Sequence, residues 1–582
     1  MKHLSNIGAE NAPAMGSGPV GGSNVSLRAL FGPDALDLTI DRPKVSSPPP
    51  NSAPQQVPLA VDPEGPVSYR ASPEVRANTR DRLRRDPITQ LRQLRLQAQV
   101  DGATVMDTKG APPIPAPKGG GGPIGSGAKG GMGGKGTGDT KPFGPAAKTL
   151  GDTALKVELP PDPAHPYVKM QADFASDLSR LGISTRGNAR IHIDDLDFQH
   201  SQGVARTAAG KTSLAQGNEV SISIGGASAA TRDKVLSADQ RARLDGIPDR
   251  VAKVETGELS SDQMARLGAD MLESTVLEKQ MRLSEIRGDL PKPPDGKKTF
   301  VNMSWGQTGQ EAAHRMTGMM LMAPAGSTAA KEVEAALGHP PTLKKLLDGR
   351  TEFDKAEFET IRDKIAYPKI QAALNAPEVK QNLDTARAGL EKELAEGRKA
   401  GILVFQAAGN SFERAGVDHP EMSRGITDGV KGLITVGATD INGPGKKDDA
   451  VAAYSSDGRI DLAAPGSKIP VYQDFDLEAG KFKTKDVDGT SFAAPYAVQV
   501  AAAMSAANPK LSVDDIAKRI TDPRVLNDIS GTTRDGGGAI DPVAAVLLAK
   551  NPGLTRAQIE GAEAALDGPK PDLAAIKKSL GL

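Results

Sequence analysis

A serine and an asparagine stand in sequence contexts that suit nucleophilic acyl-transfer chemistry. Ser491 lies within residues 488–495, between a Gly-Thr pair that permits a tight turn and an Ala/Val-rich run that is typical of a buried helix. Its hydroxyl would lie near a helix N-terminus, where free N–H groups and the helix dipole stabilise negative charge. The position suits a nucleophile, although Gly-Thr-Ser also begins many ordinary helices.

Asn410 follows the short apolar segment 402–405 and Gly409. An asparagine at the end of a buried strand can direct its side-chain N–H₂ into a cleft, where it would stabilise an oxyanion. The commoner role of a Gly-Asn pair is a turn. Residues 300–306 show the same pattern of a strand that ends in small residues, which predicts a second wall for the same cleft.

These segments resemble the motifs of the subtilisin-like serine peptidases (subtilases, peptidase family S8). The serine segment resembles Gly-Thr-Ser-x-Ala-x-Pro, the asparagine segment Ala-Gly-Asn, and the third segment Asn-Met-Ser-x-Gly. Further matches follow in the family's order at residues 434–438, 454–456 and 461–466. The resemblance runs from about residue 189 to residue 546 and implies a serine endopeptidase that hydrolyses peptide bonds.

The elements that must position these residues are strands alternating with helices. This alternation predicts an α/β fold with a mainly parallel sheet, and the resemblance implies the three-layer subtilisin-like fold. In such sheets, sites lie at the carboxyl ends of the strands.

The acid and the base are the positions at which the resemblance is weakest. Residues 189–194 predict a strand that ends in a carboxylate, and His200 begins a segment that resembles the family's His-Gly-Thr-His-Val-Ala. We assign Asp194 and His200 by this resemblance, while Asp195 and Asp197 compete with Asp194 for the role of the acid.

The residues around His200 depart from the family pattern. Ser201 and Gly203 replace the family's glycine and second histidine, and the loop between the acid and the histidine is nearly absent. A histidine on the surface is the alternative interpretation, whereas the Val-Ala pair at 204–205 favours catalysis. A catalytically impaired pseudopeptidase that binds proteins is therefore the alternative function.

The resemblance also implies the roles of the site residues. His200 would take the proton of Ser491, Asp194 would orient the imidazole, and Asn410 with the Ser491 N–H would bind the oxyanion. Two strand edges would flank an extended peptide. The substrate-binding residues are Ser304, Trp305, Gly306, Ala407, Ala408 and Gly409. Because Trp305 replaces a smaller residue, we expect a narrowed subsite.

Residues 151–548 are predicted to form the peptidase domain. Helical insertions are expected at about 227–298 and 312–384. Packing on the outside of the core is the simplest interpretation of the insertions, and a lid or exosite over the cleft is the alternative. Residues 549–582 predict a helical tail.

The residues before the domain have three compositions. Residues 1–65 are rich in Ser and Pro and are expected to be disordered, residues 66–109 are basic and partly helical, and residues 110–150 form a Gly/Pro-rich linker. A solvated helix is the simplest interpretation of the basic segment, and an arm that binds a partner or an acidic surface is the alternative. The sequence does not decide between a pro-segment, an export signal and a tether.

Composition excludes several other classes of protein. Lys plus Arg and Asp plus Glu both number 72, so charge does not indicate a nucleic-acid partner. There is no cysteine, which excludes disulfides and thiolate metal sites, and no cluster has zinc spacing. We expect no cofactor; structural calcium is not indicated.

The N-terminal residues also bear on location. They have no apolar region of the Sec type, and no apolar run is long enough to span a bilayer. Location is left open between the cytoplasm and an export route without a cleaved signal. We expect a monomer whose partners are protein or peptide substrates. We do not expect an integral membrane protein.

Overall fold

The computed structural model describes most of the chain from residue 164 onward. The described residues are 164–184, 189–195, 204–205, 207–208, 219–224, 226–289, 297–345, 351–411, 420–440, 450–456, 458–476, 481–529, 537–566, 574 and 576. The predictions for residues 1–65, 66–109 and 110–150 lie outside them.

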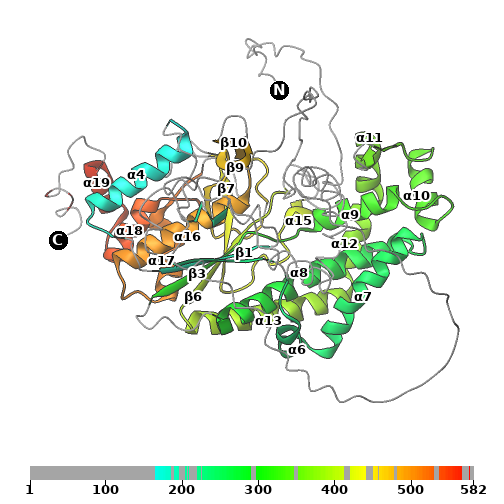
Figure 1. Ribbon diagram of the computed structural model, residues 1–582, viewed down its shortest axis with the longest axis horizontal. Helices are drawn as coiled ribbons and strands as arrows, with labels where there is room; N and C mark the ends of the chain where they lie inside the picture. The colour runs from blue at the N-terminus through cyan, green and yellow to red at the C-terminus, as the bar shows by residue number, and fades with distance from the viewer. Residues whose placement is uncertain are drawn as a thin grey trace, which may run out of the picture.

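A mainly parallel sheet lies at the centre of the domain, with helices on both faces (Figure 1). Among the described residues, its eight strands lie in the order β11-β12-β8-β7-β6-β3-β1-β2, and β11 is antiparallel to its neighbour. The strands are β1 (Ala189–Asp195), β2 (Glu219–Ile224), β3 (Lys298–Met303), β6 (Ile402–Ala407), β7 (Leu433–Thr439), β8 (Leu462–Pro465), β11 (Leu526–Asn527) and β12 (Ala539–Ile540). The predicted α/β class is confirmed.

Side chains along the central strands alternate between two cores, because successive residues of a strand point to opposite faces. Ile191, Ile193 and Phe300 belong to one core, which we call the α16 core. Val301 and Val404 belong to the other, the α8 core. The sheet therefore separates two environments.

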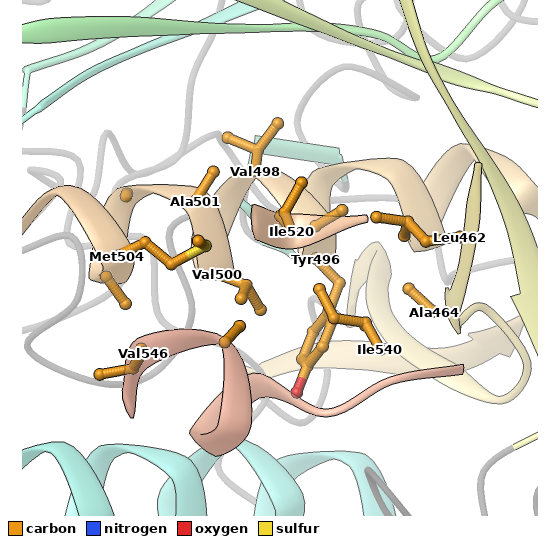
Figure 2. Close-up of a cluster of buried hydrophobic side chains, with 14 of the residues drawn as sticks. Leu462, Ala464, Tyr496, Val498, Val500, Ala501, Met504, Ile520, Ile540 and Val546 are labelled. Carbon is orange, nitrogen blue, oxygen red and sulfur yellow. The ribbon is translucent and has the colours of Figure 1, made fainter. Parts of the chain in front are cut away.

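The α16 core surrounds α16 (Thr490–Ala507), whose Ala/Val-rich sequence buries almost every side chain. Figure 2 shows Tyr496, Val500 and Met504 of this helix among Ile520, Ile540 and Val546. Small residues let α16 pack closely against β3, β6 and β7. The same core includes α4 (Pro166–Arg180), α17 (Val513–Ile520), α18 (Pro542–Lys550) and α19 (Arg556–Leu566).

The opposite core surrounds α8 (Ser261–Asp289), which packs against α9 (Gly309–Leu321), α12 (Tyr367–Asn375) and α13 (Pro377–Lys399). Side chains of α8 share this core with Val301 and Met303 of β3. The expectation that the insertions pack outside the core is therefore wrong for α8. A helical pattern of apolar residues predicts burial, but it does not tell an added helix from a layer of the domain.

The remaining described elements complete the α8 side and the connections. They are α6 (Ala229–Val235), α7 (Ala238–Glu255), α10 (Thr328–Leu337), α11 (Lys355–Ile361), the π-helix η1 (Arg362–Ala366), α15 (Pro420–Ser423), the 3-10 helix η2 (Pro523–Val525) and the antiparallel pairs β4 (Leu343–Lys345) with β5 (Thr351–Phe353) and β9 (Ile469–Asp476) with β10 (Lys481–Val487). Within the predicted helical tail, the structure describes α19, which packs in the α16 core. None of the described helices is both long and apolar enough to cross a bilayer.

Replacing Met504 by alanine tests the packing of α16. Met504 is fully buried in the α16 core, so the Met504→Ala variant should lose about 2–5 kcal/mol of unfolding free energy. Urea denaturation measures this loss. Met322→Ala, at a residue that is 42% exposed, is the matched control and should change stability by less than about 0.5 kcal/mol. Equal effects at both positions would contradict the described core.

Candidate active site

Ser491 is the second residue of α16, which begins at Thr490 directly after Gly489. A Cβ atom built on Gly489 would lie 2.9 Å from Ser491 Oγ and 3.4 Å from Asn410 Nδ2. The hydroxyl and the amide nitrogen therefore border the same space beside the backbone of Gly489. This closeness explains why position 489 is a glycine, and it confirms that the serine lies at a helix N-terminus.

The N–H groups of this first turn have different partners. Thr490 N–H donates to Asn410 Oδ1 at 2.8 Å, and Phe492 N–H donates to Gly489 O at 3.0 Å. Within the described part of the chain, the N–H of Ser491 donates to no acceptor. An N–H at this end of a helix is suited to bind a developing negative charge.

Pro495 explains how α16 is joined to β3. Because proline has no N–H, the carbonyl of Ser491, four residues earlier, lacks its usual helical partner. Ser304 Oγ donates to that carbonyl at 2.7 Å, and Asn302 Nδ2 donates to Ser304 Oγ at 2.7 Å. The end of β3 is thereby bonded to the backbone of the serine itself.

Asn410 is oriented by the neighbouring Thr490. The Oδ1 atom of Asn410 accepts hydrogen bonds from Thr490 N–H at 2.8 Å and from Thr490 Oγ1 at 2.9 Å. Thr490 Oγ1 also accepts from Gly409 N–H at 3.0 Å. With its oxygen bound on this side, the amide presents Nδ2 toward the space beside Gly489.

Gly409 must be a glycine for two reasons. Its φ angle is +108°, a conformation that L side chains rarely adopt, and an added Cβ would lie 2.8 Å from Ser456 Oγ. Ser456 in turn binds this segment, because its Oγ accepts from Ser411 N–H at 3.1 Å and its N–H donates to Gly409 O at 2.9 Å. The match at residues 454–456 thus stabilises the asparagine segment.

Gly489 is held by two of the matched segments, 454–456 and 461–466. Its N–H lies 2.9 Å from Gly466 O and 3.1 Å from Tyr454 Oη. Tyr454 Oη lies 3.1 Å from Ser467 Oγ, which donates to Asp440 Oδ1 at 2.7 Å. Segments that are far apart in the sequence therefore meet at the first turn of α16.

The segments predicted to flank a peptide end neighbouring strands. β3 and β6 pair in parallel, with Asn302 opposite Phe405. Ser304 and Gly306 follow β3, while Ala407, Ala408 and Gly409 end β6 or follow it directly. The two segments are joined where Thr308 Oγ1 and Ser411 Oγ lie 3.0 Å apart.

Asp194 and Asp195 lie on opposite faces of β1. Ile191 and Ile193 belong to the α16 core, so alternation places Asp195 on the same face, where Ser491 also lies. Asp194 faces the α8 core. Both carboxylates are buried, with exposed fractions of 1% and 3%.

The side chain of Asp194 is bound by residues of the α8 side. Arg282 donates to Asp194 Oδ1 from Nε at 2.8 Å and from Nη2 at 2.5 Å, and Trp305 Nε1 donates to Oδ2 at 3.2 Å. Burial raises the pKa of the Asp194 carboxyl, and the charge and hydrogen bonds of Arg282 offset part of that rise. The structure thus brings Asp194 to Arg282 rather than to Ser491.

Trp305 does not narrow the cleft with its side chain. The residue is only 5% exposed and belongs to the α8 core, with its indole N–H on Asp194. The expected narrowing of a subsite is therefore not supported, because alternation after β3 turns Trp305 to the face opposite Ser304.

His200 and Asp197 lie outside the described residues. Val204, Ala205 and Ala208, which follow His200 in the chain, belong to the α16 core. The segment after His200 therefore packs on the same side of the sheet as Ser491.

Lys279 and Arg282 are functional candidates that the sequence did not reveal. They lie one turn apart on α8 and are buried, with exposed fractions of 0% and 2%. Lys279 Nζ donates to Gln406 Oε1 at 3.1 Å and lies 4.7 Å from the centre of the Trp305 ring. The available signal was a basic pair on one face of a long predicted helix, but exposed basic residues on helices look the same in sequence.

The environment of α8 also perturbs pKa values. Burial lowers the pKa of Lys279 to about 7, although the negative charge of Asp194 acts in the opposite direction. Burial, reinforced by the charge of Arg282, lowers the pKa of His192 to about 3. His192 faces the α8 core, as alternation along β1 predicts.

A metal site is not apparent in the part of the chain that the structure describes. No group of three or more His, Cys, Asp or Glu side chains there is arranged to hold a metal ion.

Comparison with known proteins gives one family. The model of the Subtilase family (Peptidase_S8) matches residues 196–523, which is more than half of the 582-residue chain. The cell wall-associated protease of Bacillus subtilis (strain 168) is 34% identical over 140 residues, covering 23% of this chain and 13% of that protein. The serine protease AprX of the same organism is 33% identical over 144 residues, covering 22% and 31%.

The chain therefore spans less than a third of the length of these curated relatives. Among solved structures, the prenylagaramide maturation protease PagA is 13% identical, with a TM-score of 0.31, over 66% of this chain and 97% of that one.

The buried Lys279 predicts a pH dependence of stability. The folded-state pKa of about 7 lies below the ordinary lysine value of 10.5, so between these values the unfolded chain binds more protons. The unfolding free energy of the wild type, relative to Lys279→Met, should therefore rise with pH in this window, by up to about 1.4 kcal/mol per unit. Denaturation at pH 7, 8 and 9 measures it.

Lys399→Met is the control for this measurement, because the Lys399 side chain is 72% exposed. The unfolding free energy of Lys399→Met should differ from that of the wild type by the same amount at each of these pH values. A constant difference for Lys279→Met as well would contradict the lowered pKa.

Proposed function

The chain belongs to the subtilase family of serine peptidases, and from that premise we propose that it is a serine endopeptidase. Ser491 is the nucleophile, His200 the general base, and Asn410 with the Ser491 N–H forms the oxyanion hole. The observation that carries this proposal is that Ser491 Oγ and Asn410 Nδ2 border the same space beside Gly489. A nucleophile and an oxyanion donor must border one point, at which the substrate carbonyl binds.

In the proposed reaction, Ser491 Oγ attacks the carbonyl carbon of the scissile peptide bond while His200 accepts the hydroxyl proton. The carbonyl oxygen becomes an oxyanion that receives hydrogen bonds from Asn410 Nδ2 and Ser491 N–H. The C–N bond then breaks, and the leaving amine takes the proton from His200. Water, activated by His200, hydrolyses the acyl-enzyme and restores Ser491.

We assign the acid of the triad to Asp195 rather than to Asp194. Asp195 lies on the face of β1 that is turned toward α16, the helix of the nucleophile. The segment after His200 packs into the same α16 core. Asp194 is on the other face and is already paired with Arg282. Asp195 would hold the imidazole of His200 in its productive tautomer and stabilise the imidazolium ion.

The proposed substrate is an extended peptide or protein segment. Residues 304–306 and 407–409 end two adjacent strands, so their backbone groups are suited to pair with a peptide from both sides. Such recognition through main-chain groups requires little of the substrate sequence, so side-chain preference would depend on the surrounding pockets.

Labelling with a fluorophosphonate tests the nucleophile and its base. The wild-type chain should be labelled, while Ser491→Ala and His200→Ala should not, because the reagent reacts with a serine only when a base activates it. Gel fluorescence measures labelling, and circular dichroism checks that the variants are folded. Tyr496→Phe, five residues further along α16, is a control that should be labelled normally. A folded wild type that takes up no label would contradict the proposal.

Two substitutions separate the candidate acids. Asp195→Asn should keep its stability but lose about 10⁴-fold in kcat, since the histidine would be held in the wrong tautomer. Asp194→Asn should lose up to about 3–5 kcal/mol of stability, because it removes the carboxylate that accepts two hydrogen bonds from the buried Arg282 and leaves that arginine with Glu285. Peptide hydrolysis and urea denaturation of both variants give the answer. Loss of kcat in a stable Asp194→Asn, with an active Asp195→Asn, would reverse the assignment.

A further inference from the structure

We propose that Lys279 and Arg282 of α8 are positioning residues, which hold the carboxyl ends of β1, β3 and β6 in the arrangement that peptide cleavage requires. They act from the face of the sheet opposite Ser491 and touch neither nucleophile nor substrate. The inference rests on the proposed peptidase function and adds to it the part played by α8.

Each of the two residues bonds to the end of a different strand. Arg282 donates two hydrogen bonds to Asp194, the penultimate residue of β1. Lys279 donates one to Gln406, the penultimate residue of β6. Because the two side chains lie three residues apart on one face of α8, a single helical turn reaches both strands.

Trp305 connects Lys279 and Asp194 to a third strand end, that of β3. In the sheet β3 lies between β1 and β6, and Trp305 follows the end of β3. Its indole N–H donates to Asp194 Oδ2 at 3.2 Å, and its ring lies under Lys279 Nζ. The five side chains therefore form one buried cluster across three adjacent strand ends, which we call the α8 cluster: Asp194, Lys279, Arg282, Trp305 and Gln406.

The three strand-end members of the α8 cluster are chain neighbours of the proposed site residues. Asp194 precedes Asp195, Trp305 lies between Ser304 and Gly306, and Gln406 precedes the segment that leads to Asn410. Since adjacent residues of a strand point to opposite faces, anchoring one residue on the α8 side fixes its neighbour on the α16 side. A shift of the cluster would move the acid and both walls of the cleft together.

Stability alone does not account for buried charges at this place. Burying an ion pair costs desolvation energy that the attraction between the charges often fails to offset, and apolar replacements are often neutral or stabilising. Apolar replacements would join the hydrophobic residues of the α8 core, although α8 also buries other charged side chains, among them Asp270 and Glu273. The hydrogen bonds of the cluster are directional, as apolar contacts are not, and direction is what strand ends in an active site need.

The Lys279→Met variant separates positioning from stability. Methionine has a similar length and no charge, and Asp194 keeps its bonds from Arg282 and Trp305. We expect a melting temperature equal to or above that of the wild type, together with a fall of about tenfold in kcat/KM for fluorescein-labelled casein, since small misplacements of a site are costly. Labelling by a small fluorophosphonate, which needs little of the cleft walls, should stay within about twofold of the wild-type rate.

Arg250→Met is the matched control. Arg250, on α7, binds Asp270 of α8. In the Arg250→Met variant Asp270 keeps a second arginine, Arg266, just as Asp194 keeps Arg282 in Lys279→Met. The Arg250 pair lies away from the strand ends, so this variant should cleave casein at the wild-type rate.

Wild-type casein cleavage by Lys279→Met, or an equal loss in Arg250→Met, would overturn the inference. So would a loss of activity that merely follows a loss of stability. Failure of the proposed function has a different signature, because the wild-type chain itself would then neither take up the label nor cleave casein, and the inference would fall with it.

Discussion

The position of Ser491 depends on the hydrogen bonds that join the first turn of α16 to the ends of β3 and β6. Pro495 leaves the Ser491 carbonyl without its helical donor, and Ser304 supplies one. Thr490 joins the same turn to Asn410. A helix with this composition would pack in several ways, because small apolar side chains are not directional; these bonds select one placement.

The two faces of the sheet carry different parts of the site. On the α16 side, the serine helix and the segment after His200 share one core, and alternation along β1 places Asp195 on the same face. On the α8 side, Asp194 and Trp305 are bound by basic residues of a buried helix. The pleat of a strand enforces this separation, since neighbouring residues cannot face the same way. Two consecutive aspartates therefore have different environments and suit different roles.

The family match over residues 196–523 includes α8 as well as the serine helix and the cleft segments. The α8 cluster lies on the far side of the sheet from Ser491. Its charges lie where water is excluded, so hydrogen bonds there are strong and any unpaired group would be costly. The cluster makes the ends of three strands depend on one helix. That dependence links a structural layer to the geometry of the cleft.

The sequence by itself determined the α/β class, the strands that end near Asp194, Ser304 and Asn410, and the serine and asparagine segments, because these depend on local composition and on short ordered motifs. It left open which aspartate faces Ser491, since Asp194 and Asp195 differ by one residue at the end of one strand. It also misplaced the Trp305 side chain and the layer formed by α8. Only the tertiary structure decided these points, because the face of a strand and the depth of a helix depend on partners that lie far away in the chain.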